Sequence, residues 1–187
     1  SDEILEIKKY CNNKNYFFEA FMYLFHPQIE KIIDLIKEGE IGEILSMETN
    51  FGNNILTKKN WFGFVKKKKI DPTKRIFNKK MGGGSILDLG CYPITFSNLI
   101  ANYMQSEAEI VPKFKQVSGE IDNFEVDINA KAKLIYNNSI TSDISVSINQ
   151  NLKNETEIFG NKGTIKILDP WLPKKNSIVE VKKNNKM

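Results

Sequence analysis

The stretch VDINAKAKLIYNNSITSDISVSI, residues 126–148, is the part of the chain that decides the fold. Apolar residues occupy almost every second position on both sides of Asn137 and Asn138, and polar or charged residues stand between them. Such alternation predicts two strands that each bury one side and expose the other. The two asparagines favour a tight turn, so we expect the strands to pair as an antiparallel hairpin.

Similar alternating stretches lie before and after this hairpin. They predict further strands at residues 43–51, 110–117, 155–159, 164–168 and 178–181. Two-faced strands joined by short turns are typical of an antiparallel sheet with helices on one side. The expected fold class is therefore α+β, with a mostly antiparallel open sheet and helices on one face.

Three segments have the apolar spacing of helices. They are residues 1–14, 27–39 and 86–103, and Pro93 should kink or reset the last of them. Residues 16–21, with the sequence YFFEAF, predict a short buried strand. The first fifty residues are therefore expected to run helix, strand, helix, strand.

The composition is that of an ordinary globular domain. The 187 residues are 41% hydrophobic and 27% charged, which predicts one domain with a real core. No apolar run is long enough to cross a bilayer. The first residues also lack the pattern of a signal peptide, in which charged residues precede an apolar run. Cys11 and Cys91 form neither a disulfide framework nor a metal-ligand cluster. We therefore expect a cytoplasmic protein with no membrane partner and no bound metal.

Residues 52–80 form a long connection without clear periodicity, and such segments are usually functional or disordered. Within it, Lys66–Lys69 lie near Trp61 and Phe64, which are residue types of a nucleic-acid-binding patch. The same run is typical of a solvated loop in a lysine-rich protein, and the net charge is only +4. We expect no nucleic-acid partner; binding through residues 66–75 is the alternative.

Three ordered motifs carry a family resemblance. They are, in chain order, EAFMYLFHPQ (19–28) with GEIGEI (39–44), RIFN (75–78) through GGGSILDLGCYP (82–93), and GNKGTI (160–165) with DPW (169–171). Together they resemble the Gfo/Idh/MocA oxidoreductases. The D-x-G-x-Y form of the second motif resembles the branch of trans-dihydrodiol and D-xylose dehydrogenases and glucose–fructose oxidoreductase.

Members of this family begin with a Rossmann nucleotide-binding domain, but the chain has no G-x-G-x-x-G fingerprint, and Gly82–Gly84 has the wrong spacing. The resemblance therefore implies that residues 1–20 are the last helix and strand of a truncated Rossmann domain. Residues 21–187 are then the C-terminal substrate-binding and oligomerisation domain. The cofactor, NADP or NAD, would bind through the absent domain and not to this chain alone. The family's Glu-Lys-Pro motif with its catalytic lysine would precede Ser1, and Leu24 stands where an arginine is common.

Asp88 and Tyr92 lie four residues apart and share one face of the expected helix. Transfer of a hydride to a carbonyl leaves an alkoxide that must be protonated, and a tyrosine hydroxyl can supply the proton. A free tyrosine has a pKa of about 10, so efficient proton transfer near neutrality requires a nearby cation. The resemblance implies that Tyr92 is the proton donor of the complete enzyme and that Asp88 orients the substrate or the catalytic lysine. The alternatives are a packing role for Tyr92 and a surface or supporting role for Asp88.

Four further residues are candidates for substrate binding: Arg75, His26, Tyr23 and Trp171. Arg75 is the only arginine. It is either an exposed loop charge or a residue whose forked guanidinium group binds a hydroxyl, carboxylate or phosphate of the ligand. His26 either lines the pocket or caps the helix that begins at Pro27. Tyr23 is either a core residue or a ligand contact, and Trp171 either stacks on a sugar or plugs a turn.

The resemblance thus implies the C-terminal domain of an NAD(P)-dependent oxidoreductase that acts on a sugar or dihydrodiol-type alcohol or carbonyl. This chain alone is expected to be inactive. The branch resemblance favours NADP and implies a homodimer formed through the exposed face of the sheet. The polar residues of the strand faces are compatible with a hydrated dimer interface or simply with solvent. The alternative is a non-catalytic oligomerisation or carbohydrate-binding module.

Overall fold

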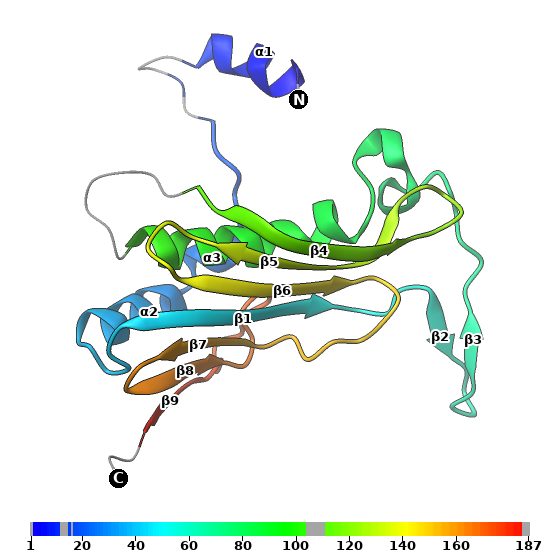
Figure 1. The fold of residues 1–187 in the computed structure, drawn as a ribbon. Helices are drawn as coiled ribbons and strands as arrows, with labels where there is room; N and C mark the ends of the chain where they lie inside the picture. The colour runs from blue at the N-terminus through cyan, green and yellow to red at the C-terminus, as the bar shows by residue number, and fades with distance from the viewer. Residues whose placement is uncertain (1, 12–14, 16, 104–110, 185–187) are drawn as a thin grey trace.

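The computed structural model describes residues 2–11, 15, 17–103 and 111–184, and its main feature is a seven-stranded sheet (Figure 1). The strand order is β4-β5-β6-β1-β7-β8-β9. The strands are β1 (Ile44–Gly52), β4 (Lys113–Ile121), β5 (Asp127–Ile135), β6 (Thr141–Ser147), β7 (Thr156–Gly160), β8 (Gly163–Ile167) and β9 (Val179–Lys183). β1 and β6 run parallel, and the other neighbouring pairs of this sheet are antiparallel. The predicted, mostly antiparallel sheet is confirmed.

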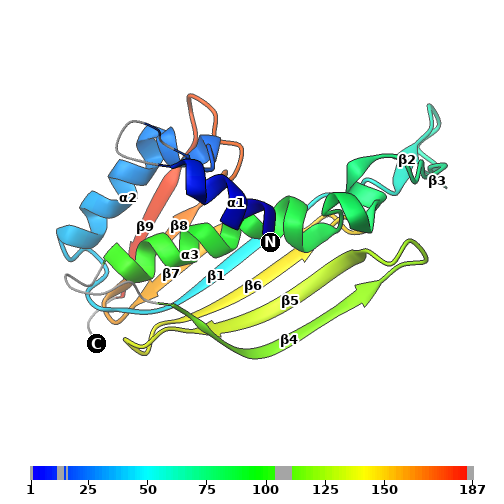
Figure 2. The same cartoon turned by 90° about the horizontal axis from the view of Figure 1, so that it is seen from above.

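Helices cover one face of this sheet. They are η1 (Met22–Phe25), α2 (Pro27–Lys37) and α3 (Cys91–Tyr103), whereas α1 (Asp2–Tyr10) stands apart from the sheet (Figure 1). α2 and α3 lie on the same side, and the opposite face carries no helix among the described residues (Figure 2). This arrangement confirms the α+β fold class. Within the described part of the chain, no helix combines the length and the apolar character needed to cross a membrane.

The hairpin predicted from residues 126–148 forms as β5 and β6. Ala130 lies opposite Val146, and both side chains are buried beneath the helices. The backbone N–H of Tyr136 donates to the carbonyl of Ile140 at 2.9 Å and closes the turn. The alternation of the sequence therefore assigned the buried side of both strands correctly.

α2 packs an apolar stripe into the core, as its sequence predicts. The helix begins with His26 as the N-cap and Pro27 at its first position, where the missing N–H of proline costs no hydrogen bond. Its buried isoleucines are Ile29, Ile32 and Ile36. They lie in one core with the strands of the sheet and with α3.

The prediction of a buried strand at residues 16–21 is wrong. The structure has no strand over residues 17–21, and Phe17 and Phe18 are 63% and 67% exposed; residue 16 lies outside the described part. A run of apolar residues forms a strand only when a neighbouring strand supplies hydrogen bonds, and no described strand pairs with this segment. The expected N-terminal remnant thus contains the helix but not the strand.

Two other predictions change at their boundaries. The strand expected at residues 110–117 begins at Lys113, and residue 110 is outside the described part. The helix expected at 86–103 begins as a single wide turn, the π-helix η4 (Ile86–Gly90), before α3 continues it. Pro93 follows in the first turn of α3 and has no N–H to donate to the preceding turn. The change from π to α geometry falls between Gly90 and Cys91, before Pro93, and a kink or reset caused by Pro93 itself stays a prediction.

Residues 52–80 contain more structure than the sequence predicts. Their elements are β2 (Thr57–Lys59), β3 (Val65–Lys67), η2 (Arg75–Phe77) and η3 (Lys79–Met81). β2 and β3 form a separate two-stranded hairpin that projects beyond the end of the large sheet (Figures 1 and 2). Phe77 packs with Ile128 and Ile148 in a second, smaller core, which anchors the part of the connection that leads to η4.

Candidate active site

Arg75, Asp88 and Tyr92 line one depression of about 310 Å³. Arg75 belongs to η2, Asp88 to η4 and Tyr92 to the first turn of α3. Phe21 and Cys91 also line this depression, and burial raises the pKa of the Cys91 thiol. The sequence placed only Asp88 and Tyr92 together; the tertiary structure adds Arg75.

The glycine turn at residues 82–84 holds η2 against η4. Gly83 lies so close to the carbonyl groups of Arg75 and Ile76 that a Cβ would collide with them. Gly84 has a φ of +105°, a region that favours glycine, and its N–H donates to the carbonyl of Ile76 at 2.9 Å. The three glycines therefore permit a close backbone approach that brings the two segments of the site together.

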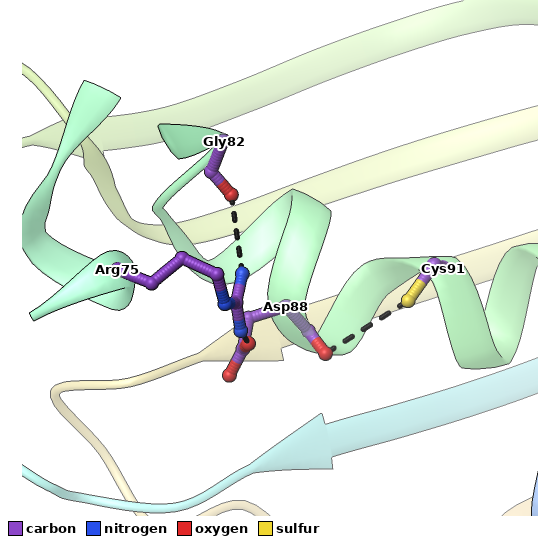
Figure 3. A network of polar contacts seen from close by, with 4 residues as sticks. All are labelled: Arg75, Gly82, Asp88 and Cys91. Carbon is purple, nitrogen blue, oxygen red and sulfur yellow. Dashed lines mark hydrogen bonds and ion pairs between the residues drawn. The ribbon is translucent and has the colours of Figure 1, made fainter. Parts of the chain in front are cut away.

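An ion pair joins the two segments (Figure 3). Nη2 of Arg75 contacts Oδ1 of Asp88, and Nη1 of Arg75 donates to the carbonyl of Gly82 at 3.4 Å. The Arg75 side chain remains 51% exposed. A guanidinium has five N–H donors, so it can hold Asp88 and still bind a ligand oxygen. The structure thus gives Asp88 a cationic partner on this chain, where the sequence suggested a substrate or a lysine.

Asp127, at the start of β5, is a residue of the site that the sequence analysis missed. Its Oδ2 accepts hydrogen bonds from Oγ of Ser85 at 2.5 Å and from the backbone N–H of Ile86 at 2.7 Å. A Cβ on Gly84 would collide with the same carboxylate. Asp127 therefore fixes the start of η4, the element that carries Asp88. In the sequence it is only one polar position of an alternating strand, so no local signal identified it.

The ring of Tyr92 is half-buried and held by other aromatic rings. Phe21 and Phe51 contact it edge-on, with centroid distances of 5.2 and 5.4 Å, and Tyr23 lies at 5.7 Å. Edge-on contacts of this kind favour one ring orientation over others. The packing therefore sets the direction of Tyr92 at the wall of the depression.

Beneath Tyr92 lies a buried aromatic cluster made of Tyr23, Phe51, Phe96 and Trp171. The hydroxyl of Tyr23 donates to the backbone carbonyl of Tyr92 at 3.1 Å, and burial raises the pKa of Tyr23, which keeps it protonated. The indole N–H of Trp171 donates to a backbone carbonyl of β1 at 2.7 Å. Tyr23 and Trp171 thus support Tyr92 from below, and their direct contact with a substrate stays a prediction.

His26 does not line the depression and instead caps α2. Its Nδ1 accepts a hydrogen bond from the backbone N–H of Gln28 at 3.3 Å. The side chain of Gln28 in turn donates to the carbonyl of Pro170 at 3.1 Å, which connects α2 to the segment that carries Trp171. This is the capping alternative named from the sequence; a pocket role of His26 stays a prediction.

The residues of this site do not fit a nicotinamide dinucleotide. A dinucleotide site presents free backbone N–H groups at the start of a helix for the pyrophosphate. Here the N–H groups of Gly83, Gly84 and Ile86 all donate to acceptors within the protein. The depression also carries the carboxylate of Asp88, which disfavours a phosphate beside it. The arrangement suits a small polar molecule.

A sheet covered on one face by helices (Figure 2), with this polar depression at the start of α3, defines an α+β domain with a candidate binding site at one helix start. The family model for the GFO/IDH/MocA C-terminal domain matches residues 29–166. The chain therefore belongs to the GFO/IDH/MocA family, and the resemblance seen in its motifs is confirmed.

Individual relatives agree with this assignment. The trans-1,2-dihydrobenzene-1,2-diol dehydrogenase of Xenopus laevis is 30% identical over 149 residues, covering 80% of this chain and 39% of the relative. The dTDP-3,4-didehydro-2,6-dideoxy-alpha-D-glucose 3-reductase of Actinomadura kijaniata is 27% identical over 147 residues, covering 79% and 38%. The chain thus spans about two fifths of the length of these curated relatives.

The fold is also that of solved oxidoreductases. The 3-ketoreductase KijD10 from Actinomadura kijaniata, in complex with NADP and TDP-benzene, superposes with a TM-score of 0.75 at 20% identity. The match covers 99% of this chain and 51% of that one. The aldose-aldose oxidoreductase from Caulobacter crescentus gives a TM-score of 0.70 at 20% identity, covering 96% and 48%.

Proposed function

We propose that the chain is the substrate-binding part of an NAD(P)-dependent oxidoreductase that acts on a sugar or dihydrodiol-type alcohol or carbonyl. The observation that carries this proposal is the convergence of Arg75, Asp88 and Tyr92 on one depression. The relatives named above support the substrate class, because one acts on a dihydrodiol and another on a dTDP-sugar.

Each residue of the depression has a distinct role in this proposal. Tyr92 exchanges the proton of the reacting oxygen, because its hydroxyl can both donate and accept. Asp88 accepts hydrogen bonds from substrate hydroxyls, and Arg75 donates to substrate oxygens. Tyr23 and Trp171 act through Tyr92 by keeping its ring in place.

The nicotinamide cofactor binds elsewhere in this proposal, because the glycine turn has no free N–H groups for a pyrophosphate. NADP is the cofactor in the KijD10 complex. We assign residues 1–20 to the end of a nucleotide-binding domain and residues 21–187 to the substrate-binding domain. The exposed apolar side chains of α1, Ile4, Leu5 and Tyr10, support this division since nothing in the described chain covers them. The free thiols of Cys11 and Cys91 support a cytoplasmic location.

The test combines the chain with a separately produced nucleotide-binding domain of a relative and follows NADPH consumption with a sugar or dihydrodiol-derived ketone. We expect turnover only in the mixture. Tyr92→Phe should lower it about 100-fold or more, the usual contribution of a positioned acid–base group. Tyr136→Phe is the matched control, because it removes a hydroxyl that donates to Asn98 at 2.9 Å and does not line the depression.

An inactive mixture, or a Tyr92→Phe variant as active as the control, would contradict the enzymatic role. Either result would favour the alternative, a non-catalytic oligomerisation or carbohydrate-binding module.

We also propose that the chain forms a homodimer through the sheet face that carries no helix. Charged and polar side chains cover this face, and Lys133 pairs with Asp143 on it at 2.7 Å. Such a face fits a hydrated, polar interface. Lys133→Glu places two acidic groups side by side and should shift the protein toward monomer in analytical ultracentrifugation. Lys31→Glu, on the exposed side of α2, is the control.

A further inference from the structure

The hairpin of β2 and β3 ends in three aromatic side chains, here called the aromatic tip, that no other described part of the chain covers. Trp61 is 97% exposed, Phe62 80% and Phe64 69%. The turn itself is well formed, because the N–H of Phe64 donates to Oδ1 of Asn60 at 2.8 Å. The N–H of Gly63 also donates to the carbonyl of Asn60 at 2.9 Å. The tip is thus a hydrogen-bonded turn that holds its apolar side chains in solvent.

A basic collar lies directly behind this tip. It consists of Lys58, Lys59, Lys66, Lys67, Lys68 and Lys69, and residues 57–69 contain no acidic residue. Among the residues that the structure describes, none of these six ammonium groups has a carboxylate within ion-pair distance. Their charge is therefore available to a partner.

The strand register distributes this charge around the hairpin. Lys58 lies opposite Lys66, so two like charges share one face, which destabilises an isolated hairpin. Lys59 and Lys67 lie on the other face, because successive side chains of a strand alternate. The collar is thus cationic on both sides, and an anionic partner would relieve its self-repulsion.

We propose that this hairpin attaches the protein to an anionic lipid surface. Trp and Phe side chains enter the boundary between headgroups and acyl chains, and lysines bind anionic headgroups around them. A single-stranded nucleic acid fits less well, because its bases stack on aromatic rings that lie in a basic groove on one face. Here the rings lie at the end of the hairpin and the lysines on both sides. This departs from the expectation of no membrane partner, which considered only spanning segments.

The attachment is independent of the proposed reaction, so it is tested separately. The chain is mixed with vesicles of pure phosphatidylcholine and with vesicles that also contain phosphatidylserine, and binding is measured by sedimentation. The chain has two tryptophans, and Trp171 is only 1% exposed. Insertion of Trp61 should therefore appear as a blue shift of the fluorescence, while Trp171 contributes a constant background. We expect co-sedimentation and the blue shift only with vesicles that contain phosphatidylserine. Both should weaken as salt is added, because salt screens the charges.

Variants separate the tip from the collar. Phe62→Ser with Phe64→Ser keeps Trp61 as the reporter, and it should weaken sedimentation with phosphatidylserine vesicles and reduce the blue shift. Lys67→Gln with Lys68→Gln should weaken binding about 25-fold, since each lysine near an anionic surface contributes about five-fold. Lys174→Gln with Lys175→Gln removes the same charge from another exposed segment and should leave binding unchanged. All these residues are exposed, so the fold should persist, which circular dichroism checks.

Three outcomes would overturn the proposal. One is no sedimentation with phosphatidylserine vesicles. Another is equal binding to both kinds of vesicle, because the collar would then have no part in it. The third is binding of a single-stranded oligonucleotide through the same lysines without any binding to vesicles.

Discussion

Two groups of aromatic side chains in this chain have opposite environments. The buried aromatic cluster comes from segments far apart in the sequence, and Tyr23 and Trp171 have almost no exposed surface. The aromatic tip comes from four consecutive positions, and Trp61 in it is 97% exposed. Residues of one tight turn point in different directions and cannot enclose one another. Burial of an aromatic ring therefore requires that separate segments converge on it.

The largest expected effect contrasts one tryptophan from each group. Trp171→Ala removes a ring packed among those of Tyr23, Phe51 and Phe96, and we expect it to lower the free energy of unfolding by about 3–5 kcal/mol. Trp61→Ala removes a solvated ring and should change the free energy of unfolding by less than about 0.5 kcal/mol. Urea unfolding followed by circular dichroism measures both. Equal decreases in the free energy of unfolding for the two variants would show that the aromatic tip is buried in solution. The contrast between the two groups of aromatic side chains would then be wrong.

A smaller effect compares two partly buried aspartates, one that accepts hydrogen bonds from a different element and one that forms an ion pair with the neighbouring strand. Asp127→Ala removes the acceptor of Ser85 and Ile86 and should lower the free energy of unfolding by about 2 kcal/mol, because hydrogen bonds to charged groups are the stronger ones. Asp143→Ala removes the half-exposed ion-pair partner of Lys133 and is the control, with little change expected because such a pair contributes about 0–1 kcal/mol. The measurement is again urea unfolding. Similar values for the two variants would mean that Asp127 does not fix η4.

The smallest effect concerns a partly buried charge network at the sheet. Lys166 lies 2.7 Å from Glu155 and 2.8 Å from Glu157, and its hydrogen bond lowers the pKa of Glu155. A lowered folded-state pKa adds stability above the ordinary pKa of a glutamate, and this stability is lost as the pH falls through the lowered value. Lys166→Met should therefore destabilise the protein slightly near neutral pH and not at all in strong acid.

Thermal unfolding at several pH values, with Lys131→Met as the control for an exposed lysine of the same sheet, measures this difference. A destabilisation by Lys166→Met that does not depend on pH would assign its effect to packing of the lysine stem rather than to charge.

Much of the fold was predictable because its elements have strong local periods. β5 and β6 alternate over their whole length, and α2 combines an apolar stripe with a cap and a proline at its start. The strand at residues 16–21 failed because a short apolar run does not reveal whether a pairing strand is available. The hairpin of β2 and β3 was missed because it is short and its lysines hide the alternation.

The candidate site was predictable only in part. Asp88 and Tyr92 belong to one local motif, so the family resemblance placed them together. Asp127 lies 41 residues beyond Ile86 in the sequence and has no local feature that marks it. Its role follows from the packing of β5 beside η4, which no pattern in a single sequence contains.

The sequence by itself determined the α+β class, most strands, α2 and the family, because these depend on local periodicity and on motifs of neighbouring residues. Only the tertiary structure decided that Arg75 pairs with Asp88, that Asp127 fixes η4, and which aromatic rings are buried. These contacts join residues far apart in the chain, and their geometry depends on how the sheet, the glycine turn and the helices pack together. Local sequence carries the tendency to form an element, whereas convergence of elements creates the environment in which a side chain acts.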